Sequence, residues 1–133
     1  MKKKLVVFSG AGISAESGLD TFRDDGGIWA NYDINDVATP EAWSKNPNLV
    51  LDFYNTRRKI ASDAKPNVAH LEIAKLEELV DVTVITQNID NLHERGGSSN
   101  VLHLHGEVDK VRSTGTDEVY TQGVNPLLFG DVC

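Results

Sequence analysis

A glycine-rich turn near the N-terminus carries residues whose types and spacing suit a phosphate-bearing ligand. An apolar run, Leu5–Phe8, is followed by Gly10-Ala11-Gly12-Ile13-Ser14-Ala15. Glycines let the backbone approach a pyrophosphate closely, and a helix that begins here directs free N–H groups and its positive dipole end at that anion. A dinucleotide fingerprint has a third glycine, for which the pattern tolerates Ala15. The alternative is a tight strand-to-helix turn that binds nothing.

Two later segments place polar side chains where a parallel sheet binds ligands. Gln87-Asn88-Ile89-Asp90 follows a strand candidate, Val82–Thr86, so it is expected at the carboxyl end of the sheet. His105 follows a further strand candidate, Val101–Leu104. An imidazole has an ordinary pKa of about 6.5, which suits a general base near neutral pH. The alternative for His105 is a hydrogen-bonded histidine at a strand end, and we interpret His103 as structural.

Three separated blocks of the chain share the order and approximate spacing of one known family. They are Gly10–Gly18 with Thr21-Phe22-Arg23 and Gly26-Gly27-Ile28-Trp29, then Thr86–Asp90 with Leu92-His93, and His103–Glu107. In these blocks the chain resembles the sirtuins, the NAD-dependent protein deacylases. The resemblance implies NAD as co-substrate, acyl-lysine proteins as partners, and the release of nicotinamide and O-acyl-ADP-ribose. Two alternatives stay open, namely an NAD hydrolase on the same scaffold and an inactive fragment.

The resemblance also implies a role for individual residues. His105 would act as the base at the nicotinamide ribose, and Asn88, the second catalytic candidate, would position the ribose or a water molecule. Asp90 would accept a hydrogen bond from the nicotinamide carboxamide, or only cap the short helix Asn91–Arg95; one carboxylate can do both. The full set of implied cofactor contacts is Gly10, Ala11, Gly12, Ala15, Thr21, Phe22, Arg23, Gln87, Asn88, Ile89, Asp90 and His105.

The loop that follows the glycine turn and one helix carry further candidate contacts. Arg23 would bind phosphate, against the alternative of a solvated side chain, and Phe22 would shield the reactive sugar from water. Tyr54 and Arg57 lie three residues apart, so they share a helix face. The desuccinylase and demalonylase (class III) sirtuins carry Tyr-x-x-Arg here to hold the carboxylate of an acidic acyl chain. The alternative is an aromatic core residue beside a surface cation.

The expected fold is α/β, a partial Rossmann-like doubly wound parallel sheet with a small insert. Lys4–Phe8, Val82–Thr86 and Val101–Leu104 are the strand candidates. The resemblance assigns residues 1–107 to the first half of an NAD-binding domain and 108–133 to the start of a small-domain insert, with the second half absent. Sirtuins that bind zinc carry paired cysteines after His-Gly-Glu. This chain has one cysteine in total, so we expect a degenerate insert without zinc and no metal site.

Composition narrows the class of protein further. The chain has 133 residues and a formal net charge of −7, which argues against nonspecific binding to nucleic acid or to an acidic membrane surface. The apolar run behind Lys2-Lys3-Lys4 is too short for a secretory signal, and no run is long enough to span a bilayer. One cysteine excludes an internal disulfide framework, so the cytoplasm is the expected compartment. The oligomeric state is unknown from the sequence.

Local signals predict the remaining elements. Thr39-Pro40, Asn46-Pro47 and Asn67 each predict a helix start, because these side chains accept hydrogen bonds from the first turn and Pro suits its first position. The third helix is expected to bury Leu71, Ala74, Leu76 and Leu79. Thr21–Asp36 is expected to be a long loop, and a hairpin is expected around Gly115.

Overall fold

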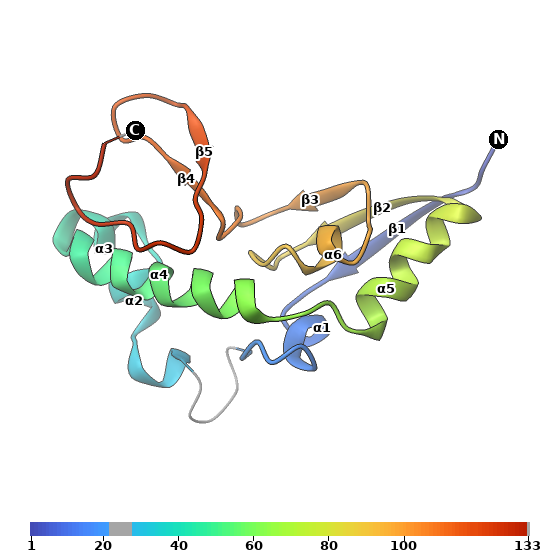
Figure 1. Ribbon diagram of the computed structural model, residues 1–133, viewed down its shortest axis with the longest axis horizontal. Coiled ribbons are helices and arrows are strands. Elements are labelled where there is room, and N and C mark those ends of the chain that lie inside the picture. The colour runs from blue at the N-terminus through green and yellow to red at the C-terminus, as the bar shows by residue number, and fades with distance from the viewer. Residues whose placement is uncertain (22–27, 133) are drawn as a thin grey trace.

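Three parallel strands form the sheet that positions the candidate site (Figure 1). The computed structural model describes residues 1–21 and 28–132. The strands are β1 (Lys4–Ser9), β2 (Asp81–Thr86) and β3 (Val101–His103), and β2 lies between the other two. The expected α/β fold with a partial parallel sheet is confirmed. The third strand is shorter than predicted, because Leu104 and His105 already lie in a turn.

Helix boundaries follow the capping signals of the sequence. The helices are α1 (Gly12–Ala15), α2 (Ile34–Val37), α3 (Pro40–Lys45), α4 (Pro47–Asp63), α5 (Val68–Lys75) and α6 (Leu92–Arg95), with 3-10 turns at Ile28–Asn31 and Leu76–Glu78. The Thr39 hydroxyl accepts from the Ala42 amide at 3.1 Å, and the Asn46 side chain accepts from Leu49 at 3.2 Å. Asn67 caps α5 in the same way. All three predicted helix starts are therefore confirmed.

Two local predictions were wrong. The segment Thr21–Asp36 is not a continuous loop, because a 3-10 turn and the start of α2 lie within it and the Asp33 side chain caps α2 at the Asn35 amide, 2.8 Å away. In α5 and the turn after it, His70 is the fully buried residue, whereas Leu71, Leu76 and Leu79 are exposed. Ala74 is half-buried, and the buried His70 ring lies under α1, with its Nε2 3.5 Å from the Ser14 hydroxyl.

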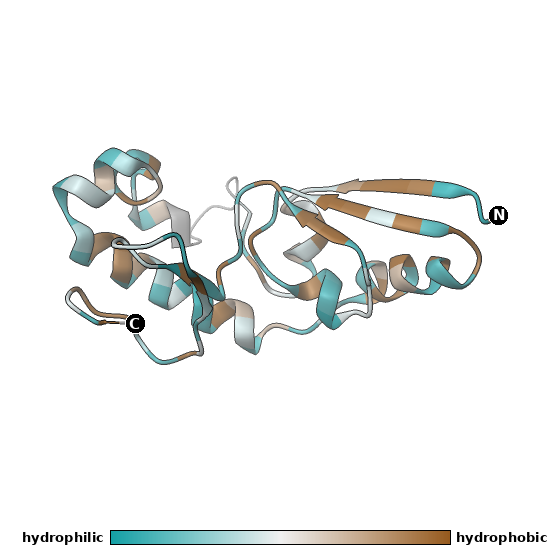
Figure 2. Ribbon diagram, turned by 90° about the horizontal axis from the view of Figure 1, so that it is seen from above, coloured by the Kyte–Doolittle hydropathy of each residue, from teal (hydrophilic) through white to brown (hydrophobic). Residues whose placement is uncertain are grey.

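The sheet is covered on one face and bare on the other. Phe8 is the register partner of Ile85, which in turn is the partner of Leu102, so these three side chains share a face. Phe8 and Leu102 are 61% and 53% exposed, whereas Val84, on the opposite face, is fully buried. In Figure 2, α5 runs along one side of the apolar strands, and the longer helical segment lies beyond their other end.

Residues 108–132 pack against the helices rather than extend the sheet (Figure 1). They contain an antiparallel hairpin of β4 (Lys110–Arg112) and β5 (Val119–Thr121), as predicted. The Asn55 side chain of α4 bonds the Leu127 backbone twice, donating to its carbonyl and accepting from its amide, both at 2.9 Å. The boundary after residue 107 stays a prediction. No helix within the described ranges is both long and apolar enough to cross a membrane.

Candidate active site

A cavity of about 490 Å³ lies at the carboxyl end of the sheet and gathers most of the predicted site. Its wall comes from the glycine turn, α4, the loop after β2 and the turn after β3. The predicted residues that line it are Ala11, Tyr54, Arg57, Gln87, Asn88, Ile89, Asp90 and His105. Gly10, Gly12, Ala15 and Thr21 lie beside this wall but do not line it, and Phe22 and Arg23 lie outside the described residues.

The glycine turn leaves open space above its backbone. Helix α1, Gly12–Ala15, is a single turn. A Cβ built at Gly10 or at Gly12 meets no other described atom within 4 Å. A ligand can therefore approach the main chain here, as a pyrophosphate requires, and the residues present fit the phosphates of a dinucleotide.

A buried polar network joins the glycine turn to the loop after β2. Asn88 donates from its side-chain amide to the Gly10 carbonyl at 3.0 Å and to the Ser14 hydroxyl at 3.3 Å. Ser14 in turn donates to Asp90 Oδ2 at 3.0 Å, and Asp90 Oδ1 accepts from the Leu92 amide at 3.0 Å. Asp90 thus bonds the first residue of α6 and also lines the cavity, while its contact with a nicotinamide carboxamide stays a prediction.

Ser14 is a buried polar residue of the site that the sequence interpretation missed. It is 2% exposed, lines the cavity and links Asn88 to Asp90. Its position within the glycine motif, between Gly12 and Gly18, was the sequence feature that could have marked it as a site residue. The structure adds Leu19, Asp20, Ile34, Ala38, Ile60, Ala61 and Val108 to the cavity wall.

His105 stands in the turn between β3 and the hairpin. Its side chain is exposed and lines both the first cavity and a second one of about 990 Å³, which also contacts α4 and the hairpin. Gly106 follows with φ of +79°, a conformation that a side chain would strain, so the chain turns sharply after His105. Within the described residues, no side-chain hydrogen bond of the His105 ring is found, and the residue lines both cavities.

Tyr54 and Arg57 both reach the first cavity from α4, as their spacing predicts. The Arg57 guanidinium carbon lies 5.5 Å from the centre of the Phe53 ring, and the Tyr54 ring packs edge-on against the same ring at 5.2 Å. Burial lowers the pKa of Arg57, and Tyr54 and Asp90 oppose that change. A guanidinium stays charged at any physiological pH, so α4 presents a partly desolvated cation to the cavity.

Two further histidines lie buried beneath the site. His70 and His93 pack edge to face with ring centres 4.9 Å apart. His70 Nδ1 accepts from the Asn67 amide, and His93 Nε2 lies 2.9 Å from the Ser9 hydroxyl. Burial lowers the pKa of both residues, and for His93 the neighbouring His70 adds to that effect. Both rings are therefore neutral at pH 7.

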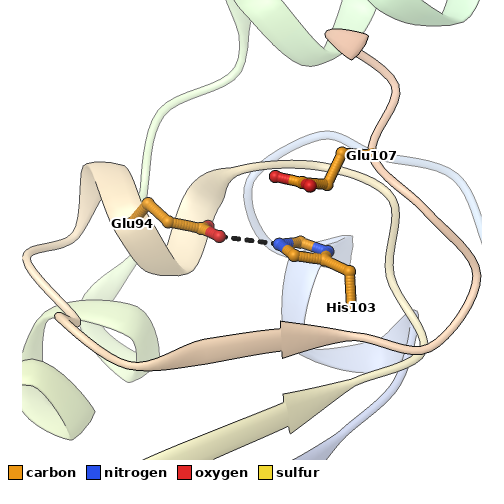
Figure 3. Close-up of side chains that lie close together, drawn as sticks. All are labelled: Glu94, His103 and Glu107. Carbon is orange, nitrogen blue, oxygen red and sulfur yellow. Dashed lines mark hydrogen bonds and ion pairs between the residues drawn. The ribbon is translucent and has the colours of Figure 1, made fainter. Parts of the chain in front are cut away.

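His103 lies between two glutamates (Figure 3). Its Nε2 is 2.6 Å from Glu94 Oε1, and Glu107 is held by the Lys110 ammonium, with both nitrogen–oxygen distances at 2.9 Å. Ligand atoms of the three residues lie within 4.8 Å of one another. Two ligands of one tetrahedral zinc lie about 3.3 Å apart. At 2.6 Å, His103 and Glu94 form a direct ion pair with no room for a cation between them.

Fold and site together define a class of protein. A parallel sheet whose glycine turn and carboxyl-end loops share one cavity is a Rossmann-like α/β arrangement with its ligand site at the strand ends. The sequence profile of the Sir2 family matches residues 10–126, and the chain belongs to that family. The predicted membership of the sirtuins is therefore confirmed.

Similar proteins agree with this assignment. A Helicobacter pylori strain J99 protein named NAD-dependent protein deacylase is 53% identical over 130 residues, which cover 98% of this chain and 56% of that protein. A Bacteroides thetaiotaomicron protein of the same name is 58% identical over 112 residues, or 84% of this chain and 48% of that protein. A solved complex of a Sir2 homologue with NAD has a TM-score of 0.86 at 42% identity, covering 96% of this chain and 50% of that chain. The chain spans about half the length of the curated relatives it matches.

Proposed function

We propose that this chain carries the NAD-binding and catalytic part of a protein-lysine deacylase that consumes NAD. The observation that carries the proposal is the single cavity shared by Ala11 of the glycine turn, the loop Gln87–Asp90 and His105. Relatives that are more than half identical are named NAD-dependent protein deacylases, and a similar structure was solved with NAD. The cytoplasmic location expected from composition belongs to the same proposal.

The chemistry assigns a distinct task to each side chain. Bound NAD would supply an electrophilic ribose carbon, to which the acyl oxygen of the substrate would bond as the bond to nicotinamide breaks. His105 accepts the proton of a ribose hydroxyl, for which an accessible imidazole is suited. Asp90 accepts from the carboxamide, and Ile89 closes that end of the cavity against water. Asn88 keeps the loop against Gly10, so that these groups face the same ligand. The acyl-lysine would enter by the second cavity, which His105 also lines.

We further propose that Tyr54 and Arg57 favour acidic acyl chains such as succinyl and malonyl over acetyl. The partly desolvated Arg57 cation and the Tyr54 hydroxyl converge on the cavity that holds the reacting groups. A carboxylate at the end of the acyl chain would form charge-assisted hydrogen bonds with both. An acetyl group offers no partner and leaves the cation without that bond. The alternative function of NAD hydrolysis would not depend on the acyl chain.

The test measures nicotinamide release from NAD with succinyl-, malonyl- and acetyl-lysine peptides, using the protein at its natural length. Arg57→Met should lower kcat/KM for the acidic acyl chains by about 10- to 150-fold, since a bond to a charged group contributes about 1.5–3 kcal/mol. Lys59→Met removes an exposed charge from the same helix and is the matched control. An unchanged ratio of succinyl to acetyl turnover in Arg57→Met would contradict the selectivity. Release of nicotinamide without any acyl-lysine peptide would favour the hydrolase instead.

A further inference from the structure

His103 connects helix α6 to the loop that forms the cavity wall. Its side chain is 5% exposed, although the Glu94 carboxylate beside it remains accessible to solvent. His103 Nδ1 lies 2.7 Å from the Asn88 carbonyl oxygen, and Nε2 lies 2.6 Å from Glu94. Figure 3 shows the ring directed at Glu94 from the end of β3. One imidazole thus bridges a helix and the backbone of a residue that lines the site.

Both partners of this ring are acceptors only, which fixes its protonation. A backbone carbonyl and an ionised carboxylate cannot donate, so each ring nitrogen must carry a hydrogen. The hydrogen bond that His103 donates to Glu94 raises the pKa of His103 above its ordinary value, in agreement with an imidazolium. The hydrogen bond to the Asn88 carbonyl and the charge of Glu107 also favour the charged form, whereas burial opposes it. The Lys110 ammonium is engaged with Glu107.

The Asn88 carbonyl is a suitable point from which to hold the loop. The Asn88 side chain is tied to the Gly10 carbonyl, so the bond from His103 fixes the same residue from the opposite side of the chain. Ile89 and Asp90 follow directly and line the cavity. Release of the carbonyl would let the peptide between Asn88 and Ile89 rotate, and the groups that face the ligand would then move with it.

We propose that His103 is a positioning residue that, braced by Glu94, holds the Asn88 carbonyl and thereby keeps the loop Gln87–Asp90 in the conformation that binds NAD. That this loop binds NAD rests on the proposed function, whereas the hydrogen bond between His103 and the Asn88 carbonyl does not. His103 touches no reacting group, since it lines neither cavity. Its effect should therefore appear in NAD affinity and in the state of the loop rather than in proton transfer.

The test separates the two bonds of the ring by matched variants. His103→Asn places an amide donor where Nδ1 lies, so it keeps the bond to the Asn88 carbonyl and loses Glu94. His103→Gln places its amide near Nε2, so it keeps Glu94 and loses the carbonyl. His103→Ala loses both. The measurements on the 133-residue chain are the carbonyl ¹³C shift of Asn88 without ligand and the Kd for NAD by calorimetry.

The expected result is that His103→Asn stays within threefold of the parent Kd, while His103→Gln and His103→Ala both weaken NAD binding at least tenfold. The Asn88 carbonyl shift should move in the same two variants, before any ligand is added. If His103→Gln keeps the parent shift and affinity while His103→Asn loses them, the residue serves only its ion pair with Glu94 and the proposal is wrong. An unchanged carbonyl shift in His103→Ala would also overturn it. Failure of the parent chain to bind NAD would instead count against the proposed function, because the shift measurement needs no ligand.

Discussion

The four histidines of the chain form two pairs that use the same side chain in opposite ways. His70 and His93 lie buried below the sheet's carboxyl end, where burial lowers their pKa and keeps them neutral. His103 and His105 belong to β3 and the turn after it, where His103 is held as a cation by Glu94 and His105 is exposed to both cavities. Partners and exposure, rather than residue type, decide which histidine supports the fold and which is available for chemistry.

The largest difference between the pairs should appear in turnover. His105→Ala removes the proposed general base, so nicotinamide release with an acylated peptide should fall by about 10²- to 10⁴-fold. Because the side chain is exposed and contributes little to packing, thermal unfolding should show a change in stability of less than about 0.5 kcal/mol. Turnover within threefold of the parent would mean that His105 is not the base.

The buried pair should show the reverse behaviour. His93→Ala removes a fully buried ring that contacts His70 and the Ser9 hydroxyl, and so should lower the free energy of unfolding by about 1–3 kcal/mol. Urea denaturation followed by circular dichroism measures this loss, with His105→Ala as the exposed control. Equal midpoints for the two variants would show that burial does not distinguish the pairs.

The pairs should also respond to pH with opposite sign. His70 and His93 have folded-state pKa values below the ordinary 6.5, so the folded state resists their protonation. Stability should therefore fall as the pH drops below about 6.5, through the range between the unfolded and folded pKa values. Urea midpoints from pH 7.5 down to pH 5 measure the slope. The slope should be smaller in His93→Gln, which keeps a donor toward Ser9 but cannot be protonated. An equal slope in this variant would mean that other groups cause the loss of stability at low pH.

His103 should have the smallest effect on stability, and this effect should appear as the pH rises. Its folded-state pKa is raised above 6.5, so its stabilisation is complete below about pH 6.5 and is lost as the pH rises through the folded value. Glu94→Gln should remove this dependence and cost less than about 1 kcal/mol at pH 6, because Glu94 is partly exposed and screened by solvent. Glu72→Gln, which breaks the exposed pair with Lys75, is the matched control. An unchanged alkaline slope in Glu94→Gln would contradict the ion pair.

The sequence predicts most of what is local in this molecule and little of what depends on distant contacts. Thr39-Pro40 and Asn46-Pro47 contain within a few residues the groups that begin a helix, so these starts were predictable. The exposure of Leu71 was not predictable, because the residue that α5 buries instead is His70, whose ring lies 3.5 Å from the distant Ser14 hydroxyl of α1. The partners of His103 come from residues nine and fifteen positions away, so its role also needed the structure.

The candidate site was predicted from three blocks of sequence that the fold brings to one cavity. The hydrogen bonds that join these blocks were not predicted. Ser14 belongs to the glycine motif, but its bonds to Asn88 and Asp90 depend on how β1 and β2 pair. Tyr54 and Arg57 both line the cavity from α4, while the role toward an acidic acyl chain that the resemblance implied stays a prediction.

Titration of the ¹⁵N-labelled chain with NAD, followed residue by residue by NMR, measures most directly whether the shared cavity is the NAD site. Saturable shifts should appear at Ala11, Ser14, Asn88, Ile89 and His105, which line the first cavity, whereas Asn100 and Thr121, which line neither cavity, should not move. Shifts confined to residues outside that cavity, or none at NAD concentrations up to several millimolar, would contradict the assignment of this site.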